Sequence, residues 1–366
     1  MKIAIFHSFL DNIGGAEMVT LTLAKELNAD IYTTNIDRDK IAKMGFENLS
    51  IYSIGPVPLN APFRHQMVLW RFRYLNLKNK YDFFIIAGDW AVSSAIYNRP
   101  NLWYIHSPMR EIWDLYPYTR ENNVPRYWRL LFDIWVKYNR KLVKYYIQSV
   151  DKFVCNSANT QKRIKKYLKK DAQIIHPPID TKSFYYNKNG DFWLSVNRLI
   201  NHKRINLQIE SFRSLPDEKL IIVGSYEKSR HFVKYADEIQ GGLPSNIKIK
   251  NWVSKSDLID LYANCKGFIT TSLDEDFGMT PVEAMAAGKP VIAPNEGGYK
   301  ETIISGKTGI LIEDLNTKKL SQAIKNISQE PQLFKTPCQN QAQKFDTASY
   351  IKKIKQAIEE TLATLK

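Results

Sequence analysis

Two carboxylates in the segment from residue 273 to 292 could bind a polar ligand. Glu275 follows a strand-like run on a Gly-containing loop, and Glu283 lies in the first turn of a predicted helix that ends at Gly288. Both carboxylates and the free amides of the helix start are expected to face one crevice. Carboxylates accept hydrogen bonds from sugar hydroxyls, and helix-start amides bind phosphate or sugar oxygens. The helix dipole alone explains Glu283 but not the whole segment.

A pair of cations follows another strand-like run, residues 192–196. Arg198 and Lys203 lie at the carboxyl end of this run, where open α/β sheets bind ligands. Two cations at this spacing suit a diphosphate. The alternative interpretation is a solvated basic loop.

Two glycines and a histidine follow strand-like runs nearer the N-terminus. Gly14 and Gly15 precede a predicted helix over residues 16–27, so a phosphate could approach backbone N–H groups there, although a tight turn without a ligand is the simpler explanation. His106 ends the run 103–106, where a lone histidine is more often a structural hydrogen-bonding group than a catalyst. His7 ends the first run, and we assign it a structural role.

Strand-like runs alternate with helical patterns along the chain, which predicts parallel sheets covered by helices. The first series comprises residues 3–7, 31–34, 83–87, 103–106, 152–156 and 173–176. After a Pro-rich break at 176–180, the second comprises residues 192–196, 219–223, 247–249, 267–271, 290–293 and 309–312. The pattern predicts an N-terminal domain over residues 1–185, a C-terminal domain over 186–345 and a final helix within 346–366. That helix needs a packing partner for Ile351, Ile354 and Ile358, and the first domain is one candidate.

These motifs together resemble the retaining glycosyltransferases of family 4, whose fold is called GT-B. The resemblance covers nearly the whole chain and rests on Gly14-Gly15-Ala16-Glu17, His106-Ser107-Pro108, Arg198 with Lys203, and the Glu275 and Glu283 pattern. It implies an α/β fold with two Rossmann-like, doubly wound parallel-sheet domains facing a central cleft. The first domain would bind the acceptor, and the second the nucleotide sugar.

The resemblance also implies roles for single residues. Glu283 would hold the donor ribose, Glu275 with nearby amides the donor sugar, and Arg198 with Lys203 the diphosphate. The implied catalytic set is His106, Arg198, Lys203 and Glu275. The implied donor-binding set is Gly14, Gly15, Arg198, Lys203, Val253, Glu275, Phe277, Gly278, Met279, Thr280 and Glu283. The chain departs from the usual family pattern at Asn197, Asp276 and Arg204.

The implied reaction moves a hexose from a nucleotide-diphosphate sugar to a lipid-linked or growing-glycan acceptor. The resemblance to mannosyltransferases of polysaccharide and O-antigen assembly favours mannose from GDP-mannose. A UDP-sugar donor, a GT-B phosphorylase or epimerase, and a non-catalytic membrane- or nucleic-acid-binding protein are the alternatives. Asp274 and Asp276 have the Asp-x-Asp spacing of a metal site, but we expect no metal or other cofactor because Arg198 and Lys203 would neutralise the diphosphate.

The chain's positive charge is concentrated near aromatic residues. Its 366 residues carry a formal net charge of +15, and residues 60–150 hold 14 basic against 6 acidic side chains together with 21 of the 45 aromatic ones. Between residues 128 and 145 an aromatic and aliphatic stripe lies opposite a basic one on a predicted helix. The stripe consists of Trp128, Leu131, Trp135, Tyr138, Leu142 and Tyr145. Such a helix suits an anionic membrane surface, although for the stripe itself an ordinary surface helix with its apolar side in the core is the favoured interpretation.

We therefore expect a membrane- and acceptor-binding region in the first domain. Its predicted residues are Arg64, Arg71, Arg73, Trp128, Arg129 and Trp135. No nucleic-acid signature is present, and the sequence does not indicate an oligomeric state. The absence of a signal-peptide pattern and of a long apolar run predicts a cytoplasmic protein on the inner face of the cell membrane. Three widely spaced cysteines suggest neither a disulfide nor a zinc site.

Overall fold

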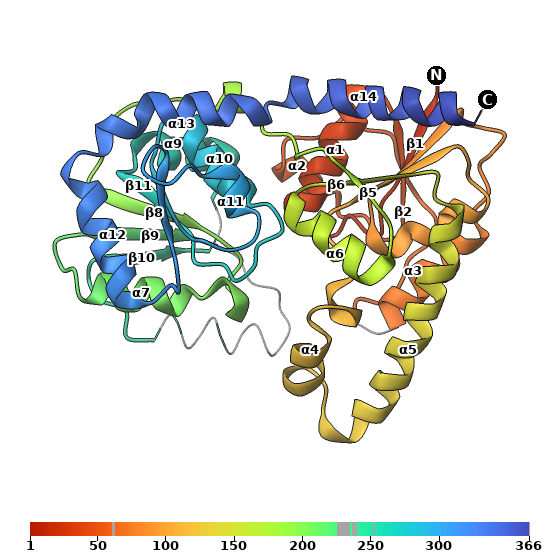
Figure 1. Ribbon diagram of the computed structural model, residues 1–366, viewed down its shortest axis with the longest axis horizontal. Helices are drawn as coiled ribbons and strands as arrows, with labels where there is room; N and C mark the ends of the chain where they lie inside the picture. Colours follow the sequence, from red (N-terminus) through yellow and green to blue (C-terminus); the bar gives the residue numbers. More distant parts are fainter. Residues whose placement is uncertain (61–62, 225–234, 236–238, 240, 252, 366) are drawn as a thin grey trace. The chain divides into compact units, whose positions relative to one another are not determined.

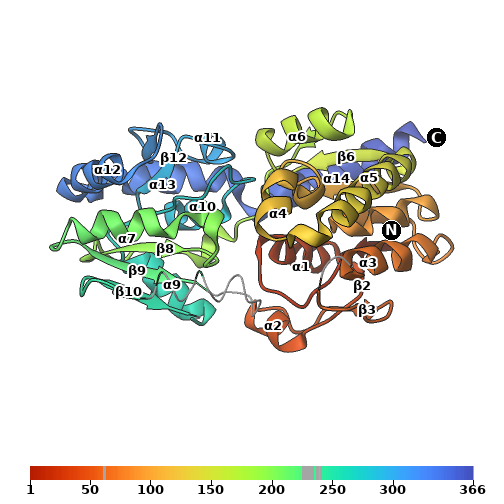
Figure 2. The ribbon, with the colours of Figure 1, turned by 90° about the horizontal axis from the view of Figure 1, so that it is seen from below.

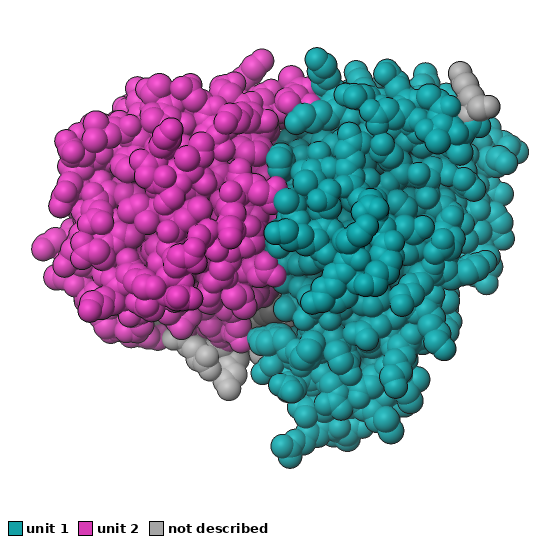
Figure 3. Space-filling model, in the orientation of Figure 1, with its two compact units in different colours: residues 1–178, 350–366 teal, residues 179–349 magenta. Residues whose placement is uncertain are grey.

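The computed structural model describes residues 1–366 apart from 61–62, 225–234, 236–238, 240, 252 and 366 (Figure 1). The chain forms two compact units (Figure 3): unit 1 comprises residues 1–178 and 350–366, and unit 2 comprises residues 179–349. The division lies nearer the N-terminus than the expected boundary at residue 185. The backbone explains this, because Ile179 N–H donates to Phe345 O at 2.9 Å and Ile179 O accepts from Thr347 N–H at 3.1 Å, which ties Ile179 to unit 2.

Unit 1 is built on a seven-stranded parallel sheet with the order β3-β2-β1-β4-β5-β6-β7. Its strands are β1 (Ile3–Phe6), β2 (Asp30–Thr33), β3 (Ile51–Ser53), β4 (Phe83–Ile86), β5 (Asn101–Ile105), β6 (Lys152–Cys155) and β7 (Gln173–Ile174). Its helices are α1 (Gly15–Leu27), α2 (Arg38–Lys43), α3 (Phe63–Tyr74), α4 (Tyr116–Asn122), α5 (Arg129–Tyr146), α6 (Ala158–Leu168) and the C-terminal α14 (Thr347–Thr364). Short 3₁₀ segments join them, namely η1 (Asp89–Ile96), η2 (Arg110–Ile112), η3 (Arg126–Trp128) and η4 (Ile147–Ser149). The sequence did not predict β3, a short edge strand with two exposed residues.

The central strands of unit 1 are buried because they consist almost entirely of apolar residues. Every residue of β1 and β4 is buried, as expected for strands covered on both faces. The C-terminal α14 adds a further covering layer. Its Tyr350 ring lies 5.7 Å from the Tyr104 ring of β5, and its Glu360 forms an ion pair of 2.9 Å with Lys152 of β6.

Unit 2 is built on a six-stranded parallel sheet with the order β10-β9-β8-β11-β12-β13. Its strands are β8 (Phe192–Val196), β9 (Lys219–Val223), β10 (Ile247–Lys250), β11 (Gly267–Ile269), β12 (Val291–Pro294) and β13 (Gly309–Ile312). Its helices are α7 (Ile205–Arg213), α9 (Lys255–Asn264), α10 (Met279–Ala286), α11 (Tyr299–Thr302), α12 (Thr317–Gln329) and α13 (Lys335–Ala342). Its 3₁₀ segments are η5 (Thr181–Ser183), η6 (Asn201–Lys203), η7 (Pro331–Phe334) and η8 (Gln343–Phe345).

Each unit has helices on both faces of its sheet (Figures 1 and 2). Successive residues of β12 show how the faces are divided, because Val291 and Ala293 join one apolar cluster and Ile292 joins the other. The two predicted doubly wound parallel-sheet domains are therefore confirmed. No helix in the described part of the chain is long and apolar enough to cross a bilayer.

Candidate active site

Three loops at the carboxyl edge of the unit 2 sheet bring distant residues together. They follow the neighbouring strands β8, β11 and β12, and they span residues 197–204, 270–278 and 295–298. Because parallel strands end at the same edge, this is where ligands bind in open α/β sheets. β11 ends at Ile269, earlier than the predicted residue 271, and leaves Thr270 and Thr271 to make side-chain hydrogen bonds.

Lys203 and Glu275 form an ion pair at this edge. Lys203 Nζ lies 2.6 Å from Glu275 Oε2, and the Ser272 hydroxyl also donates to that carboxylate. Burial opposes the charged form of Glu275, but the Lys203 charge, the hydrogen bonds from Lys203 and Ser272 and the charge of His202 together lower its pKa to about 2. Glu275 is therefore a permanent carboxylate at neutral pH, ready to accept hydrogen bonds.

The loop carrying Glu275 is held by glycines on its neighbour. A Cβ atom on Gly297 would lie 2.4 Å from Glu275 O, and Gly298 N–H donates to the same oxygen at 2.8 Å. Gly278 has a φ of +87° and caps α10, and a Cβ there would lie 2.6 Å from Tyr299 Cε1. The buried ring of Phe277 lies 5.4 Å from that of Phe345, so only its backbone is suited to ligand contact.

Glu283 lies in the second turn of α10, and the prediction of the first turn is wrong. The helix begins at Met279 because Gly278 takes the left-handed conformation, and no acidic residue lies in its first turn. Tyr262 Oη donates to Glu283 Oε2 at 2.8 Å. Burial raises the pKa of Glu283, while the Tyr262 hydrogen bond and the charge of Lys255 oppose that rise. Glu283 is thus fixed in position by a neighbouring hydroxyl.

The remaining predicted donor residues lie around these loops. Arg198 is exposed in the loop after β8, and Val253 is half-buried between β10 and α9, packed against the apolar cluster that contains Tyr262. Met279 and Thr280 form the first turn of α10, as expected for residues offering free amides. Within the described ranges, no group of three or more His, Cys, Asp or Glu side chains is arranged to hold a metal ion.

Arg204 is a functional candidate that sequence reasoning recorded only as a departure from the family pattern. Its backbone is left-handed, with a φ of +50°, and its Nε donates to Thr271 O at 2.6 Å. Its guanidinium also forms an ion pair of 3.2 Å with Glu296, which in turn accepts from Asp274 N–H at 3.2 Å. Arg204 thus ties the three loops together. Sequence alone gave no signal for this pairing, because the partners lie 92 positions apart.

We expect Arg204 and Glu296 to be energetically coupled. In a double-mutant cycle of Arg204→Ala and Glu296→Gln, the coupling measured by urea unfolding should be about 1–3 kcal/mol, because the pair also holds backbone groups. The matched control is the exposed pair Arg213 and Glu210, separated by 3.6 Å within α7. Its coupling should stay below about 0.5 kcal/mol. Equal coupling in both cycles would contradict the bridging role of Arg204.

A buried histidine, His7, and a half-buried one, His106, lie near the carboxyl edge of the unit 1 sheet. His7 Nδ1 lies 3.0 Å from Thr20 Oγ1, and burial together with the charge of His106 lowers the pKa of His7 to about 3. Burial lowers the pKa of His106 to about 4, and its buried Nε2 has no hydrogen-bond partner among the described residues. Both rings are therefore neutral at physiological pH. His7 has the structural role expected of it, whereas His106 has a ring nitrogen available.

These histidines predict an acid-sensitive fold. The unfolded chain binds a proton at His7 near pH 6.5, but the folded chain does so only near pH 3, so the free energy of unfolding should fall as pH drops from about 6.5 toward 4. Thermal unfolding of the wild type should show this loss, and His7→Gln should show a smaller one. An NMR titration of the imidazole signals checks the cause directly. A His7 midpoint near 6.5 would contradict the buried, neutral state.

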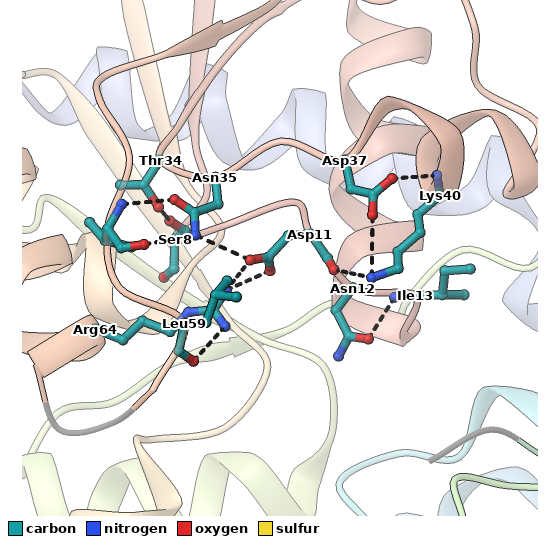
Figure 4. Close-up of polar contacts among 11 residues, drawn as sticks. Ser8, Asp11, Asn12, Ile13, Thr34, Asn35, Asp37, Lys40, Leu59 and Arg64 are labelled. Atoms are coloured by element: carbon teal, nitrogen blue, oxygen red, sulfur yellow. Dashed lines mark hydrogen bonds and ion pairs between the residues drawn. The ribbon is translucent and has the colours of Figure 1, made fainter. Parts of the chain in front are cut away.

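The loop after β1 is fixed by a polar network (Figure 4). Asp11 forms an ion pair of 2.5 Å with Arg64 and accepts from Asn35 Nδ2 at 3.3 Å, while its backbone oxygen accepts from Lys40 Nζ at 2.7 Å. The network precedes Gly14, which caps α1 in an extended conformation, and Gly15, the first residue of that helix. Arg64 therefore positions the glycine loop, and its side chain is only 15% exposed.

The other residues predicted to face a membrane or acceptor have mixed environments. Arg71 donates to Ile54 O at 3.2 Å and Pro56 O at 2.8 Å, and Arg73 lies over the Tyr97 ring. Arg129 donates to Glu121 O at 2.9 Å. Trp128 is exposed, whereas Trp135 packs between Trp90 and Phe132, with both ring centroids 5.8 Å away.

The predicted stripe of α5 is not one surface. Trp135 and Leu142 pack against the core, whereas Leu131, Tyr138 and Tyr145 are exposed. The fully buried residues of the helix are Val136, Asn139, Val143 and Tyr146. The buried face of the helix is therefore rotated relative to the predicted stripe. It includes Asn139, a polar residue outside that stripe.

Comparison with known proteins agrees with this architecture. The family model described as Glycosyl transferases group 1 matches residues 178–345, and that of Glycosyltransferase Family 4 matches residues 13–183. An uncharacterized glycosyltransferase of Methanocaldococcus jannaschii is 29% identical over 203 residues, 55% of this chain and 56% of that protein. The alpha-1,3/1,6-mannosyltransferase ALG2 of Dictyostelium discoideum is 25% identical over 393 residues, 90% of each chain. The structure of Anabaena HepE in complex with UDP-glucose superposes with a TM-score of 0.77 at 19% identity, covering 98% of this chain and 100% of that one.

The fold and the two family matches define a class of enzyme. The chain belongs to the family 4 glycosyltransferases and has the GT-B fold. The predicted family and fold are confirmed, and the chain is a glycosyltransferase.

Proposed function

We propose that this enzyme transfers a hexose with retention of anomeric configuration, with mannose from GDP-mannose as the favoured donor. The acceptor is a lipid-linked sugar or a growing glycan. The observation that carries the proposal is the Lys203 and Glu275 pair beside the start of α10, which offers a cation, a permanent carboxylate and free amides at one sheet edge. Relatives named as mannosyltransferases, including ALG2, support the choice of sugar.

In this proposal unit 2 binds the donor. Glu275 accepts hydrogen bonds from the sugar hydroxyls, and the backbone amides from Phe277 to Thr280 bind sugar or phosphate oxygens. Glu283 holds the ribose. Lys203 moves part of its interaction from Glu275 to the diphosphate, which it binds together with Arg198. His106, with its unpartnered Nε2, contacts the donor sugar, and the Gly14 and Gly15 backbone contacts the diphosphate.

The chemical step needs no carboxylate nucleophile. The acceptor hydroxyl oxygen forms a bond to the anomeric carbon on the face that the leaving diphosphate vacates. The bond from that carbon to the phosphate oxygen breaks, and the acceptor's proton passes to this oxygen. The developing charge on the diphosphate is stabilised by Arg198, Lys203 and the helix-start amides, the electrostatic contribution that is usually largest in such reactions.

A panel of nucleotide sugars tests the donor assignment. We expect GDP-mannose to raise the melting temperature and to release GDP in the presence of acceptor, more than UDP-glucose or UDP-N-acetylglucosamine does. With Glu283→Gln, about ten times more donor should be needed for the same rise in melting temperature. A carboxylate can accept hydrogen bonds from both ribose hydroxyls, whereas an amide has only one acceptor oxygen. A preference for a UDP-sugar would overturn the donor, and phosphate-dependent or acceptor-free turnover would indicate a phosphorylase or an epimerase.

Two further parts of the proposal concern metal and location. Turnover should be unchanged by EDTA, because cationic side chains neutralise the diphosphate; loss of activity that Mg²⁺ or Mn²⁺ restores would contradict this.

A lipid-linked acceptor requires the enzyme to work at a membrane surface, and we propose peripheral association with the inner face of the cell membrane.

A further inference from the structure

Unit 1 exposes a run of large apolar side chains along α5 and the 3₁₀ turn η3 that precedes it. Each of these side chains is between 48% and 79% exposed. They are Tyr127, Leu131, Ile134, Tyr138 and Tyr145, which we term the α5 stripe. At about 100° per residue they fall within a band of roughly 60° on the helix surface. The band lies away from the buried residues Val136, Asn139, Val143 and Tyr146, so packing within unit 1 does not explain it.

Exposed lysines border the α5 stripe on one side. Lys137, Lys141 and Lys144 are all exposed, and none forms an ion pair with a described residue. The one acidic residue of α5, Asp133, is engaged by Arg120 at 2.8 Å. The free charge of this helix is therefore entirely positive.

The helix α3 packs on the same 3₁₀ segment as α5 and also exposes aromatic side chains. Both α3 and α5 pack on η1, and Phe63, Trp70 and Tyr74 of α3 are at least half exposed. The Arg73 guanidinium of α3 lies 4.9 Å from the Tyr97 ring centroid. A cavity of about 440 Å³ opens on α3. It is lined by Ile54, Met67, Trp70, Arg71, Tyr74 and Leu75.

We propose that the α5 stripe and the exposed aromatic residues of α3 form the surface by which this enzyme docks on a bilayer containing anionic lipids. Tyrosine and tryptophan favour the boundary between headgroups and acyl chains, and Leu131 and Ile134 supply apolar area to bury there. The lysines then face the anionic headgroups. This inference deepens the proposed lipid-linked acceptor, because it names the face of unit 1 that meets the membrane.

Charge favours a bilayer over the other occupants of such a surface. In a symmetric dimer the same patch meets itself, and α5 offers no free carboxylate to pair with its lysines, because Asp133 is engaged by Arg120. A nucleic acid would match the lysines but not the aliphatic Leu131 and Ile134, because bases stack on flat rings.

Flotation with vesicles tests the proposal without any donor or acceptor. We expect the wild type to bind vesicles containing phosphatidylglycerol at low salt, to bind less as salt rises, and to bind phosphatidylcholine vesicles weakly. Replacing Lys137, Lys141 and Lys144 with glutamine should weaken binding to the anionic vesicles about 100-fold. Leu131→Ser with Ile134→Ser should weaken it about tenfold or more.

Matched controls come from unit 2. They are Lys300, Lys318 and Lys325 replaced together by glutamine, and the exposed Leu333 replaced by serine. These should bind vesicles as the wild type does, and all variants should keep the wild-type melting temperature and its response to nucleotide sugars. Equal binding by stripe and control variants would overturn the proposal. The proposal would also be overturned if the wild type did not bind vesicles but formed a dimer in sedimentation, or bound RNA, and the stripe variants lost that dimer or that RNA binding. If the protein bound vesicles but no nucleotide sugar raised its melting temperature, the proposed function would be contradicted and the proposed docking surface would still be supported.

Discussion

Replacing Glu275 with glutamine is expected to lower kcat/KM for donor turnover by about 10²- to 10⁴-fold. A hydrogen bond to a charged group contributes about 1.5–3 kcal/mol, and the carboxylate can accept two from the sugar where the amide keeps one weaker acceptor. The change also leaves Lys203 beside a neutral group. Steady-state rates with the donor selected by the nucleotide-sugar panel provide the measurement.

The pH profile adds a sharper criterion for Glu275. Because its pKa is about 2, wild-type activity should not fall near pH 4.5 through protonation of this group. The control Glu330→Gln, an exposed carboxylate in the same unit, should leave kcat/KM unchanged. If Glu275→Gln stayed within a factor of about three of the wild type while remaining folded, Glu275 would have no part in donor binding.

The second large effect is expected from the cations proposed to bind the diphosphate. Lys203→Ala and Arg198→Ala should each lower kcat by about 10²- to 10³-fold, equivalent to about 2.7–4 kcal/mol, because each removes a charge that faces the leaving group. Burst and steady-state measurements of nucleotide release would separate this loss from weaker donor binding.

The two variants should differ in their dependence on pH. Lys203→Ala removes the charge and hydrogen bond that keep Glu275 ionised, so the pKa of Glu275 should rise and activity should fall further in acid. Arg198→Ala should lack this additional loss. Lys300→Ala, an exposed cation on α11, serves as the control and should retain full activity. Wild-type rates in both Arg198→Ala and Lys203→Ala would refute the proposed clamp.

The candidate site could be located from the sequence because each part has a local signature. Continuous apolar runs predicted most strands, and the glycine at position 288 marked where α10 ends. Short or polar elements carried no such signal. The edge strand β3 has two exposed residues in three, and α10 starts earlier than predicted, at Met279, directly after the positive-φ residue Gly278.

Longer-range features could not be predicted because they depend on charges meeting across the fold. Arg204 looked like one more cation in a basic loop, yet it binds Thr271 O and Glu296 on two different loops. Arg64 looked like a membrane-facing cation, yet it pairs with Asp11 in the loop that leads to Gly14. The sequence does not distinguish a structural cation from a ligand-binding one. Only the residues that surround the side chain in the folded protein show which role it has.

The sequence by itself determined two doubly wound domains, the family and the set of residues around Glu275 and Glu283, because strand periodicity and turn chemistry are local properties. The tertiary structure decided which of these residues meet. It paired Lys203 with Glu275, placed residues 350–366 in unit 1, and turned α5 so that Leu131, Ile134 and Tyr138 face outward. The physical reason is that burial and pairing are set by packing between elements far apart in the chain, where local propensity has no influence.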